Sequence, residues 1–217
     1  MDLPALFVGD PALIVVDIQR GTAMPPEVVG IAHMPGWQDR IERAERLVAA
    51  AREAGVPVVF FQEVHRRSGV DFGRELDGAE GPHCIEGDEA TELWPTLRPE
   101  PGEAHIVKRR YSGFIGTEFE ILLRGLGVST LVLIGGLTDV CVHYTFADAH
   151  QRDYHVRVVE DCVGGSSRAR HDAALDAMEY LQTGARRSTA EIIDAFAGLG
   201  GRPKAAASSA LVQGEFA

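Results

Sequence analysis

Cysteine is scarce in this sequence: Cys84, Cys141 and Cys162 are the three thiols among 217 residues, and no two form a Cys-x-x-Cys pair. A sparse, odd set of this kind does not build the disulfide framework of small secreted domains. Reduced thiols in a reducing compartment fit best, and each then serves as a packed core residue or as a reactive group. We expect Cys84 and Cys162 to be structural.

Long apolar runs are absent as well. One of the strongest, residues 131–136 (LVLIGG), is far shorter than the roughly 20 residues that a membrane-spanning helix needs. The first ten residues, MDLPALFVGD, lack the basic and long apolar regions of a signal peptide. We therefore expect a cytoplasmic protein without a membrane partner.

Positive charge is in short supply. The sequence has 21 lysines and arginines against 32 aspartates and glutamates, which gives a net charge of −11. Binding to nucleic acids depends on clustered basic side chains that neutralise phosphates. The basic clusters at 66–67, 108–110 and 186–187 are too scattered to form such a face, so we expect no nucleic-acid partner.

The sequence does contain a regular alternation of short β-rich runs and longer helical runs, and 45% of its residues are hydrophobic. The continuous apolar run 12–17 is typical of a strand buried on both faces, and the spacing of apolar residues over 37–54 is typical of an amphipathic helix. Such alternation predicts an α/β fold with a mostly parallel sheet and right-handed crossovers. We predict strands at 12–17, 56–61, 105–108, 130–135, 156–160 and 185–188, and helices at 37–54, 117–126, 139–152, 168–181 and 189–196.

The length fits one domain, which we place at residues 1–200. Residues 63–103 are rich in glycine, proline and charge, and an excursion of this length in a compact domain tends to carry function. The tail 201–217 is rich in alanine, serine and glycine. We expect it to be loose or to pack on a partner subunit.

Three potentially reactive residues fall at or just beyond the ends of predicted strands. Asp17 ends the first strand, Lys108 ends the third, and Cys141 follows the fourth at the start of a predicted helix. Ligands of open parallel sheets bind beyond the carboxyl ends of the strands, so we expect these side chains to meet along one edge. The positive end of the helix dipole and a nearby ammonium would lower the pKa of Cys141, and Asp17 would act as general base and then acid.

Each of these residues also has an ordinary structural interpretation. A cysteine near a strand end is usually a small buried apolar residue, an aspartate there often caps a turn, and a lysine often extends its amine to solvent. Three such residues at three strand ends favour catalysis over coincidence.

The segments that carry these residues resemble a known family. ALIVVDIQ (12–19), VKRRYSGFIGT (107–117) and IGGLTDVCVHYTFADAHQRDYHVRVVEDCVGG (134–165) resemble, in this order, the isochorismatase-like cysteine hydrolase superfamily. That superfamily includes nicotinamidases, N-carbamoylsarcosine amidase, biuret and ureidoacrylate amidohydrolases, and isochorismatases. The resemblance spans residues 13–196. It implies a three-layer α/β/α fold with a doubly wound six-stranded sheet, and a homodimer or homotetramer.

The resemblance also implies a site. Asp17, Lys108 and Cys141 form its catalytic triad, and a cis peptide bond joins Gly136 to Leu137. The backbone N–H groups of Leu137 and Cys141 form an oxyanion hole, and Cys141 attacks a small amide, ureide or carbamoyl compound through a thioester and releases ammonia or an amine. Retention of Cys141 argues against a true isochorismatase, which cleaves a vinyl ether without a cysteine nucleophile.

Nicotinamidases of this superfamily hold a metal ion with an Asp-x-His pair and a later histidine. This sequence has Glu63-Val-His65 and then His83, so the first position is longer by one methylene. Glutamate and histidine are competent ligands for Zn²⁺ or Mn²⁺. We expect no metal and no other cofactor, with Glu63 and His65 as polar groups that face the substrate. The alternative is a divalent metal bound by Glu63, His65 and His83.

The remaining candidates concern the substrate. We assign Gln19, Glu63, Arg110, Tyr111 and Phe114 to substrate binding, with Arg110 available to grip a carboxylate through two hydrogen bonds. A cysteine amidohydrolase is the predicted function. A metal-assisted, nicotinamidase-like amidase and a non-catalytic thiol protein that binds a ligand or senses redox state are the alternatives.

Overall fold

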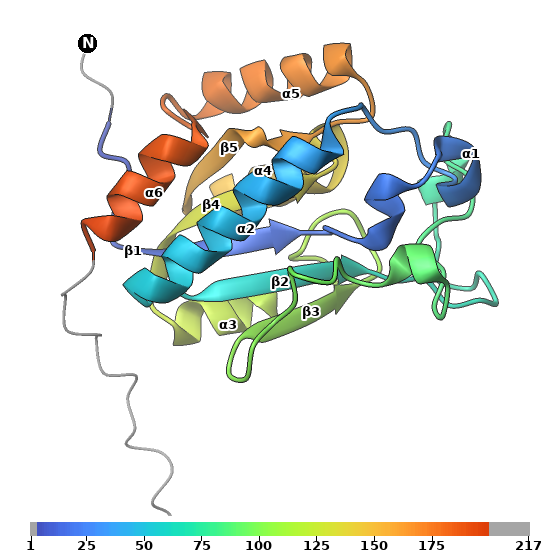
Figure 1. The fold of residues 1–217 in the computed structure, drawn as a ribbon, viewed down its shortest axis with the longest axis horizontal. Coiled ribbons are helices and arrows are strands. Elements are labelled where there is room, and N and C mark those ends of the chain that lie inside the picture. The colour runs from blue at the N-terminus through green and yellow to red at the C-terminus, as the bar shows by residue number, and fades with distance from the viewer. Residues whose placement is uncertain (1–3, 200–217) are drawn as a thin grey trace, which may run out of the picture.

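The structure, a computed structural model, describes residues 4–199 and consists of one sheet with helices on both faces (Figure 1). Its six strands are parallel throughout and lie in the order β3-β2-β1-β4-β5-β6. The six predicted strands are confirmed, in a fully rather than mostly parallel sheet. The tail predicted at 201–217 lies outside the described residues. The strands are β1 Asp10–Val16, β2 Val58–Glu63, β3 Ala104–Lys108, β4 Val128–Gly136, β5 His155–Gly164 and β6 Arg186–Arg187.

The helices form two layers. In Figure 1, α2 and α6 cross the near face of the sheet, and the apolar core on that face is made by these two helices and the strands beneath them. The opposite core contains residues of α3, α4 and α5. The helices are α1 Pro26–Val29, α2 Trp37–Ala54, α3 Phe119–Gly125, α4 His143–His150, α5 Arg168–Leu181 and α6 Thr189–Ala197. None of the helices in residues 4–199 is long and apolar enough to cross a bilayer.

The sequence pattern explains the two best predicted elements. Every residue of β1 after Asp10 is buried, because helices cover both faces of a parallel sheet. In α2, the buried residues recur every three or four positions and include Leu47, which is fully excluded from water. Burial of one such leucine side chain stabilises the fold by about 1.5–3 kcal/mol. Gly55 ends α2 in the left-handed conformation, and its N–H caps the last turn.

The segment predicted as one helix over 139–152 begins differently. Residues Thr138–Val142 form a π-helical turn, and α4 starts only at His143. Cys141 therefore lies in a widened turn between β4 and α4. Turns of this kind occur often at functional sites.

The strand order reverses between β1 and β4, and this reversal fixes where a ligand binds. The chain runs outward from β1 to β2 and β3, returns to β4 beside β1, and continues outward to β5 and β6. In doubly wound sheets the crevice at such a point accepts the ligand. Gly135 lies against β1 there: a Cβ atom at this position would stand 2.0 Å from the carbonyl oxygen of Val16, and its φ is +109°. Only glycine allows this approach.

Candidate active site

The three residues predicted at strand ends meet at the carboxyl edge of the sheet. Lys108 Nζ lies 2.8 Å from Asp17 Oδ2 and 3.4 Å from Cys141 Sγ. The Lys108 side chain is fully buried and Cys141 is 6% exposed. Asp17 has a φ of +49°, in the left-handed region that non-glycine residues rarely adopt. The structure thus brings the predicted triad together around one buried ammonium, with a backbone conformation at Asp17 that is typical of functional sites.

Glu63, the last residue of β2, enters the same cluster. Its Oε2 atom accepts hydrogen bonds from Lys108 Nζ at 2.7 Å and from the Cys141 thiol at 3.2 Å. Its backbone N–H donates to Asp17 Oδ1 at 2.9 Å. Two carboxylates therefore share the Lys108 ammonium. The Cys141 thiol donates to Glu63, the carboxylate that the sequence assigns to substrate binding.

The prediction that the helix dipole and Lys108 lower the pKa of Cys141 is wrong, because the net shift of this pKa is upward. Burial raises the pKa of the Cys141 thiol well above its ordinary value, and the negative charges of Glu63 and Asp17 raise it further. The Lys108 ammonium lowers this pKa but is outweighed. Burial likewise raises the pKa of Asp17, against the effect of Lys108. The raised pKa favours a protonated Cys141, so attack by this sulfur would require transfer of its proton.

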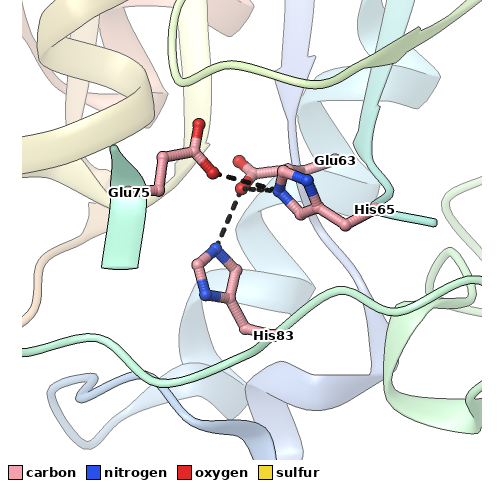
Figure 2. Close-up of side chains that lie close together, drawn as sticks. All are labelled: Glu63, His65, Glu75 and His83. Atoms are coloured by element: carbon pink, nitrogen blue, oxygen red, sulfur yellow. Dashed lines mark hydrogen bonds and ion pairs between the residues drawn. The ribbon is translucent and has the colours of Figure 1, made fainter. Parts of the chain in front are cut away.

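A second cluster lies on the other side of the Glu63 carboxylate (Figure 2). Its Oε1 atom lies 3.3 Å from His65 Nε2 and 3.1 Å from His83 Nε2, and His65 Nε2 lies 3.0 Å from Glu75 Oε2. One ligand atom from each of these four residues lies within 4.8 Å of the others. The structure thus brings together the three residues of the metal alternative and adds Glu75 as a fourth.

The donor set fits a divalent cation on two observations. Both oxygens of Glu75 are buried, and among the described residues neither accepts a well-aligned hydrogen bond, although Oε2 lies 3.0 Å from His65 Nε2. His83 Nδ1 lies 2.7 Å from the Gly81 carbonyl, which can only accept, so Nδ1 carries the proton and Nε2 of a neutral ring offers its lone pair to the cluster. A lone pair that faces the Glu63 carboxylate is repelled unless a proton or a metal ion lies between them.

The summed charge of the Lys108 cluster and the histidine cluster also calls for either added protons or a metal ion. The carboxylates of Asp17, Glu63 and Glu75 and the ammonium of Lys108 leave two negative charges in a buried site. Two imidazolium ions or one divalent cation would cancel them. Burial lowers the pKa of His65, but its interactions with the carboxylates of Glu63 and Glu75 outweigh burial and raise this pKa to about 9.

A cavity of about 130 Å³ opens beside Cys141 at this edge and has room for a small molecule rather than a polymer. Leu137 and Cys141 both line it, and the peptide bond between Gly136 and Leu137 is cis, as the resemblance implied. Trp37 from α2 forms part of its apolar wall and packs on Trp94 at 5.5 Å between ring centroids. The predicted oxyanion donors thus belong to residues beside the thiol.

The residues assigned to substrate binding divide into two groups. Gln19, Glu63 and Tyr111 line the cavity. Gln19 Nε2 also donates to the carbonyl oxygens of Glu63 at 2.9 Å and Thr91 at 2.6 Å, so this side chain ties the long 64–103 segment to the end of β2.

Arg110 and Phe114 lie elsewhere. Arg110 Nη1 donates to the Asp71 carbonyl at 2.6 Å, and Arg110 does not line the cavity. Phe114 is buried in the core beside Phe119, with the Arg152 guanidinium over its ring. The structure therefore offers no direct cavity contact for the two side chains that sequence reasoning placed there.

Two acidic residues of the site were missed. Glu75 joins the histidine cluster, and Glu80 lines the cavity, where its Oε2 atom accepts a hydrogen bond from the Tyr111 hydroxyl at 2.8 Å. Both belong to the segment 63–103, which was singled out as functional for its length alone. The acidic run around them, GRELDGAEGPH, has no helical or strand period that would place one carboxylate rather than another.

A family model described as the isochorismatase domain matches residues 11–192. The chain belongs to the isochorismatase family. The ureidoacrylate amidohydrolase RutB of Methylobacterium radiotolerans is 35% identical over 192 residues, which cover 78% of this chain and 74% of the relative.

Solved structures of this family share the fold. A cysteine hydrolase from Pseudomonas syringae pv. phaseolicola 1448A has a TM-score of 0.77 and 27% identity, and the match covers 87% of this chain and 93% of that one. An N-carbamoylsarcosine amidase from Thermoplasma acidophilum has a TM-score of 0.69 and 29% identity, and the match covers 83% of this chain and 96% of that one. The recognised family, the three-layer α/β/α fold and the hydrolase class acting on C–N bonds are thereby confirmed.

Proposed function

We propose that this chain is a cysteine amidohydrolase that cleaves a small amide, ureide or carbamoyl compound through a Cys141 thioester. The observation that carries the proposal is the Cys141 thiol at 3.4 Å from Lys108, beside Asp17 and open to a small cavity. The amidohydrolase names of its relatives support the bond type.

The chemistry follows from the groups present. The Cys141 thiol passes its proton to Asp17, and the sulfur attacks the carbonyl carbon to form a C–S bond. Lys108 stays charged: burial lowers its pKa, but the carboxylates of Asp17 and Glu63 outweigh burial and hold this pKa well above its ordinary value. The negative oxygen of the tetrahedral intermediate accepts hydrogen bonds from the N–H groups of Leu137 and Cys141.

The second half of the reaction regenerates the enzyme. Asp17 donates the proton to the leaving nitrogen as the C–N bond breaks, and ammonia or an amine departs. Water then attacks the thioester, the C–S bond breaks, and the thiol regains its proton while the acid or carbamate leaves. A carboxylate whose pKa burial has raised is suited to both transfers, because it holds a proton more readily than an exposed aspartate does.

The experiment measures ammonia release from nicotinamide, biuret, N-carbamoyl amino acids, maleamate, ureidoacrylate and the cationic (2-aminoethyl)urea. Cys141→Ala is expected to reduce turnover of the best substrate by at least about 1,000-fold, because it removes the nucleophile. Mass spectrometry of quenched wild-type reactions is expected to find the acyl group on the peptide that contains Cys141. Turnover that persists in Cys141→Ala, or no turnover with any of these compounds, would sink the proposal.

We propose as a second candidate that Glu63, His65, Glu75 and His83 hold a divalent transition-metal ion, as in a metal-assisted amidase. The buried oxygens of Glu75, which accept no well-aligned hydrogen bond among the described residues, and the Nε2 atom of His83 turned to the cluster support it. The contact of His83 Nδ1 with the Gly81 carbonyl is the kind that orients a metal-binding histidine. When bound, such an ion supplies a Lewis acid beside the nucleophile.

Metal binding is tested without reference to turnover. Zn²⁺ or Mn²⁺ at 100 times its Kd is expected to stabilise wild-type protein by about 2.7 kcal/mol, read as a rise in Tm that a chelator reverses. Glu75→Gln is expected to remove most of this rise, and Glu53→Gln on the exposed end of α2 is the charge-matched control. An unchanged Tm in wild-type protein would favour two imidazolium ions in place of the metal.

The oligomeric state and the compartment stay predictions. We propose a homodimer or homotetramer, and light scattering after size exclusion measures it directly. A monomer at micromolar concentration would contradict this expectation.

A further inference from the structure

We propose that Glu80, held in place by Tyr111, determines substrate specificity, and that it selects amides or ureides whose second functional group is a protonated amine and disfavours those with a carboxylate. The inference rests on the proposed function, because it names the substrate class of the same cavity. It reverses the expectation that Arg110 receives a substrate carboxylate.

Glu80 is the carboxylate of the cavity that lacks a cation. The other two that line it, Asp17 and Glu63, both pair with Lys108, at 2.8 Å and 2.7 Å. Within residues 4–199, no lysine, arginine or histidine nitrogen lies within 4.0 Å of a Glu80 oxygen; its contact is the Tyr111 hydroxyl at 2.8 Å. A carboxylate with one neutral partner in a partly enclosed cavity retains its attraction for a positive charge.

Tyr111 fixes this carboxylate in position. The Tyr111 ring packs on Tyr144 of α4 at 5.5 Å between centroids, and its hydroxyl donates to Glu80 Oε2. Burial raises the pKa of Glu80, and the Tyr111 hydrogen bond opposes that rise. The acceptor is therefore oriented before a substrate arrives, which reduces the entropy lost on binding.

The basic side chains that line the cavity have other partners. His33 Nε2 lies 2.8 Å from the Met24 carbonyl, and His83 Nε2 lies 3.1 Å from Glu63 Oε1. Arg109 and Arg110 do not line the cavity. Arg109 Nε pairs with Asp71 Oδ2 at 3.0 Å, and Arg110 donates to the Asp71 carbonyl, so both guanidinium groups bind the loop at Asp71. Arg40 lines the cavity, but its Nη1 and Nη2 atoms donate to the carbonyl oxygens of Pro35 and Met34. A substrate carboxylate would meet Glu80 without a free guanidinium to hold it, and like charges in a confined site repel.

The test compares three ureas of similar length: (2-aminoethyl)urea, which is a cation at neutral pH, propylurea, which is neutral, and 3-ureidopropionate, which is an anion. Calorimetry with Cys141→Ala measures their binding without turnover. The cation is expected to bind at least about tenfold more tightly than propylurea, because a hydrogen bond between two charged groups is stronger than one between neutral groups. The anion is expected to bind more weakly than propylurea.

Variants assign the preference to Glu80. In the Cys141→Ala background, Glu80→Gln is expected to bring the cation and propylurea to within about threefold of each other, since the amide keeps the size but loses the charge. Tyr111→Phe is expected to reduce the preference in part. Glu53→Gln removes an exposed glutamate of α2 and is expected to leave the ratio unchanged.

The outcomes separate this inference from the proposed function. Tighter binding of the anion, equal binding of all three, no measurable binding of any, or a cation preference that survives Glu80→Gln would each overturn it. If Cys141→Ala binds the three ureas in the predicted order but wild-type protein hydrolyses none of them, the role of Glu80 is supported and the amidohydrolase proposal is contradicted. If wild-type protein hydrolyses 3-ureidopropionate best, the amidohydrolase proposal is supported and the role of Glu80 is contradicted.

Discussion

The ammonium of Lys108 and the carboxylate of Glu63 lie 2.7 Å apart in an interior that excludes water from nearly all of both side chains. The same ammonium also pairs with Asp17, so one cation compensates two carboxylates. A buried ion pair contributes little net stability while it is complete, but removal of one partner leaves an uncompensated charge. We therefore expect Lys108 to stabilise the fold as well as to take part in the proposed chemistry.

Lys108→Met is expected to lower the free energy of unfolding by about 3–5 kcal/mol, because it leaves Asp17 and Glu63 buried without their shared cation. Urea unfolding followed by circular dichroism measures it. Arg168→Ala breaks an exposed ion pair to Asp172 at 3.0 Å and is expected to cost no more than about 1 kcal/mol. Similar losses in the two variants would mean that the Lys108 cluster is far better hydrated than its burial indicates.

Gly135→Ala is expected to destabilise the fold by about 3 kcal/mol or more, because the new Cβ would collide with the Val16 carbonyl at a φ that alanine avoids. Displacing that carbonyl moves Asp17, so activity is expected to fall as well. Gly125→Ala is the matched control: its Cβ meets no atom within 4 Å, and the change is expected to stabilise α3 by about 0.5–1 kcal/mol. Thermal melting of both variants checks the contrast, and an unaffected Gly135→Ala would refute the argument.

Arg157 in β5 is 1% exposed and attaches the N-terminal segment to the sheet. Its guanidinium donates to the carbonyl oxygens of Leu6, Ala5 and Val156 at 2.8–2.9 Å. Arg157→Met keeps most of the apolar stem but removes all three bonds, and the expected loss is about 2–3 kcal/mol. Urea unfolding measures this loss, and native-state hydrogen exchange is expected to show faster exchange in residues 4–8. Unchanged exchange there would contradict the role.

His171 in α5 should make stability depend on pH. Burial lowers the pKa of His171, with a further lowering by Arg168, and His171 Nδ1 lies 2.9 Å from Thr138 Oγ1. Below about pH 6.5 the unfolded chain binds a proton that the folded chain takes up only at lower pH, so this residue reduces stability as the pH falls. The stability lost by wild-type protein between pH 7.5 and 5.5 is expected to exceed that lost by His171→Asn. Equal losses would show that His171 does not contribute.

The sequence was sufficient to predict the sheet and the meeting of Asp17, Lys108 and Cys141 at one edge, because both follow from rules that hold along the chain. Continuous apolar runs identified the strands, and parallel topology placed Asp17, Lys108 and Cys141 at one edge. The family motifs added the cis bond before Leu137. The extra turn of π-helix at Cys141 was not predictable, since no residue in Thr138–Val142 marks it.

The surroundings of the triad depend on tertiary packing, which spacing does not report. Arg110 stands in a run of basic residues, and only the position of the Asp71 loop decides which way its guanidinium turns. Glu75 and Glu80 lie in a segment without periodicity, so their approach to the site has no signature in the sequence. The pKa of Cys141 was misjudged because the expectation counted the helix and Lys108 but not burial and the Glu63 charge.

The site has two parts, the strand ends and the loops of the cavity wall, and Gln19 joins them through its hydrogen bonds to Glu63 and Thr91. The ends of β1, β3 and β4 hold the reacting groups, and each is fixed by the register of the sheet. Much of the cavity wall comes from the segments 18–41 and 80–90, which lie outside the strands. We therefore expect loop exchange between members of the family to change which molecule is recognised while Asp17, Lys108 and Cys141 keep their positions, provided that the Gln19 contacts are kept.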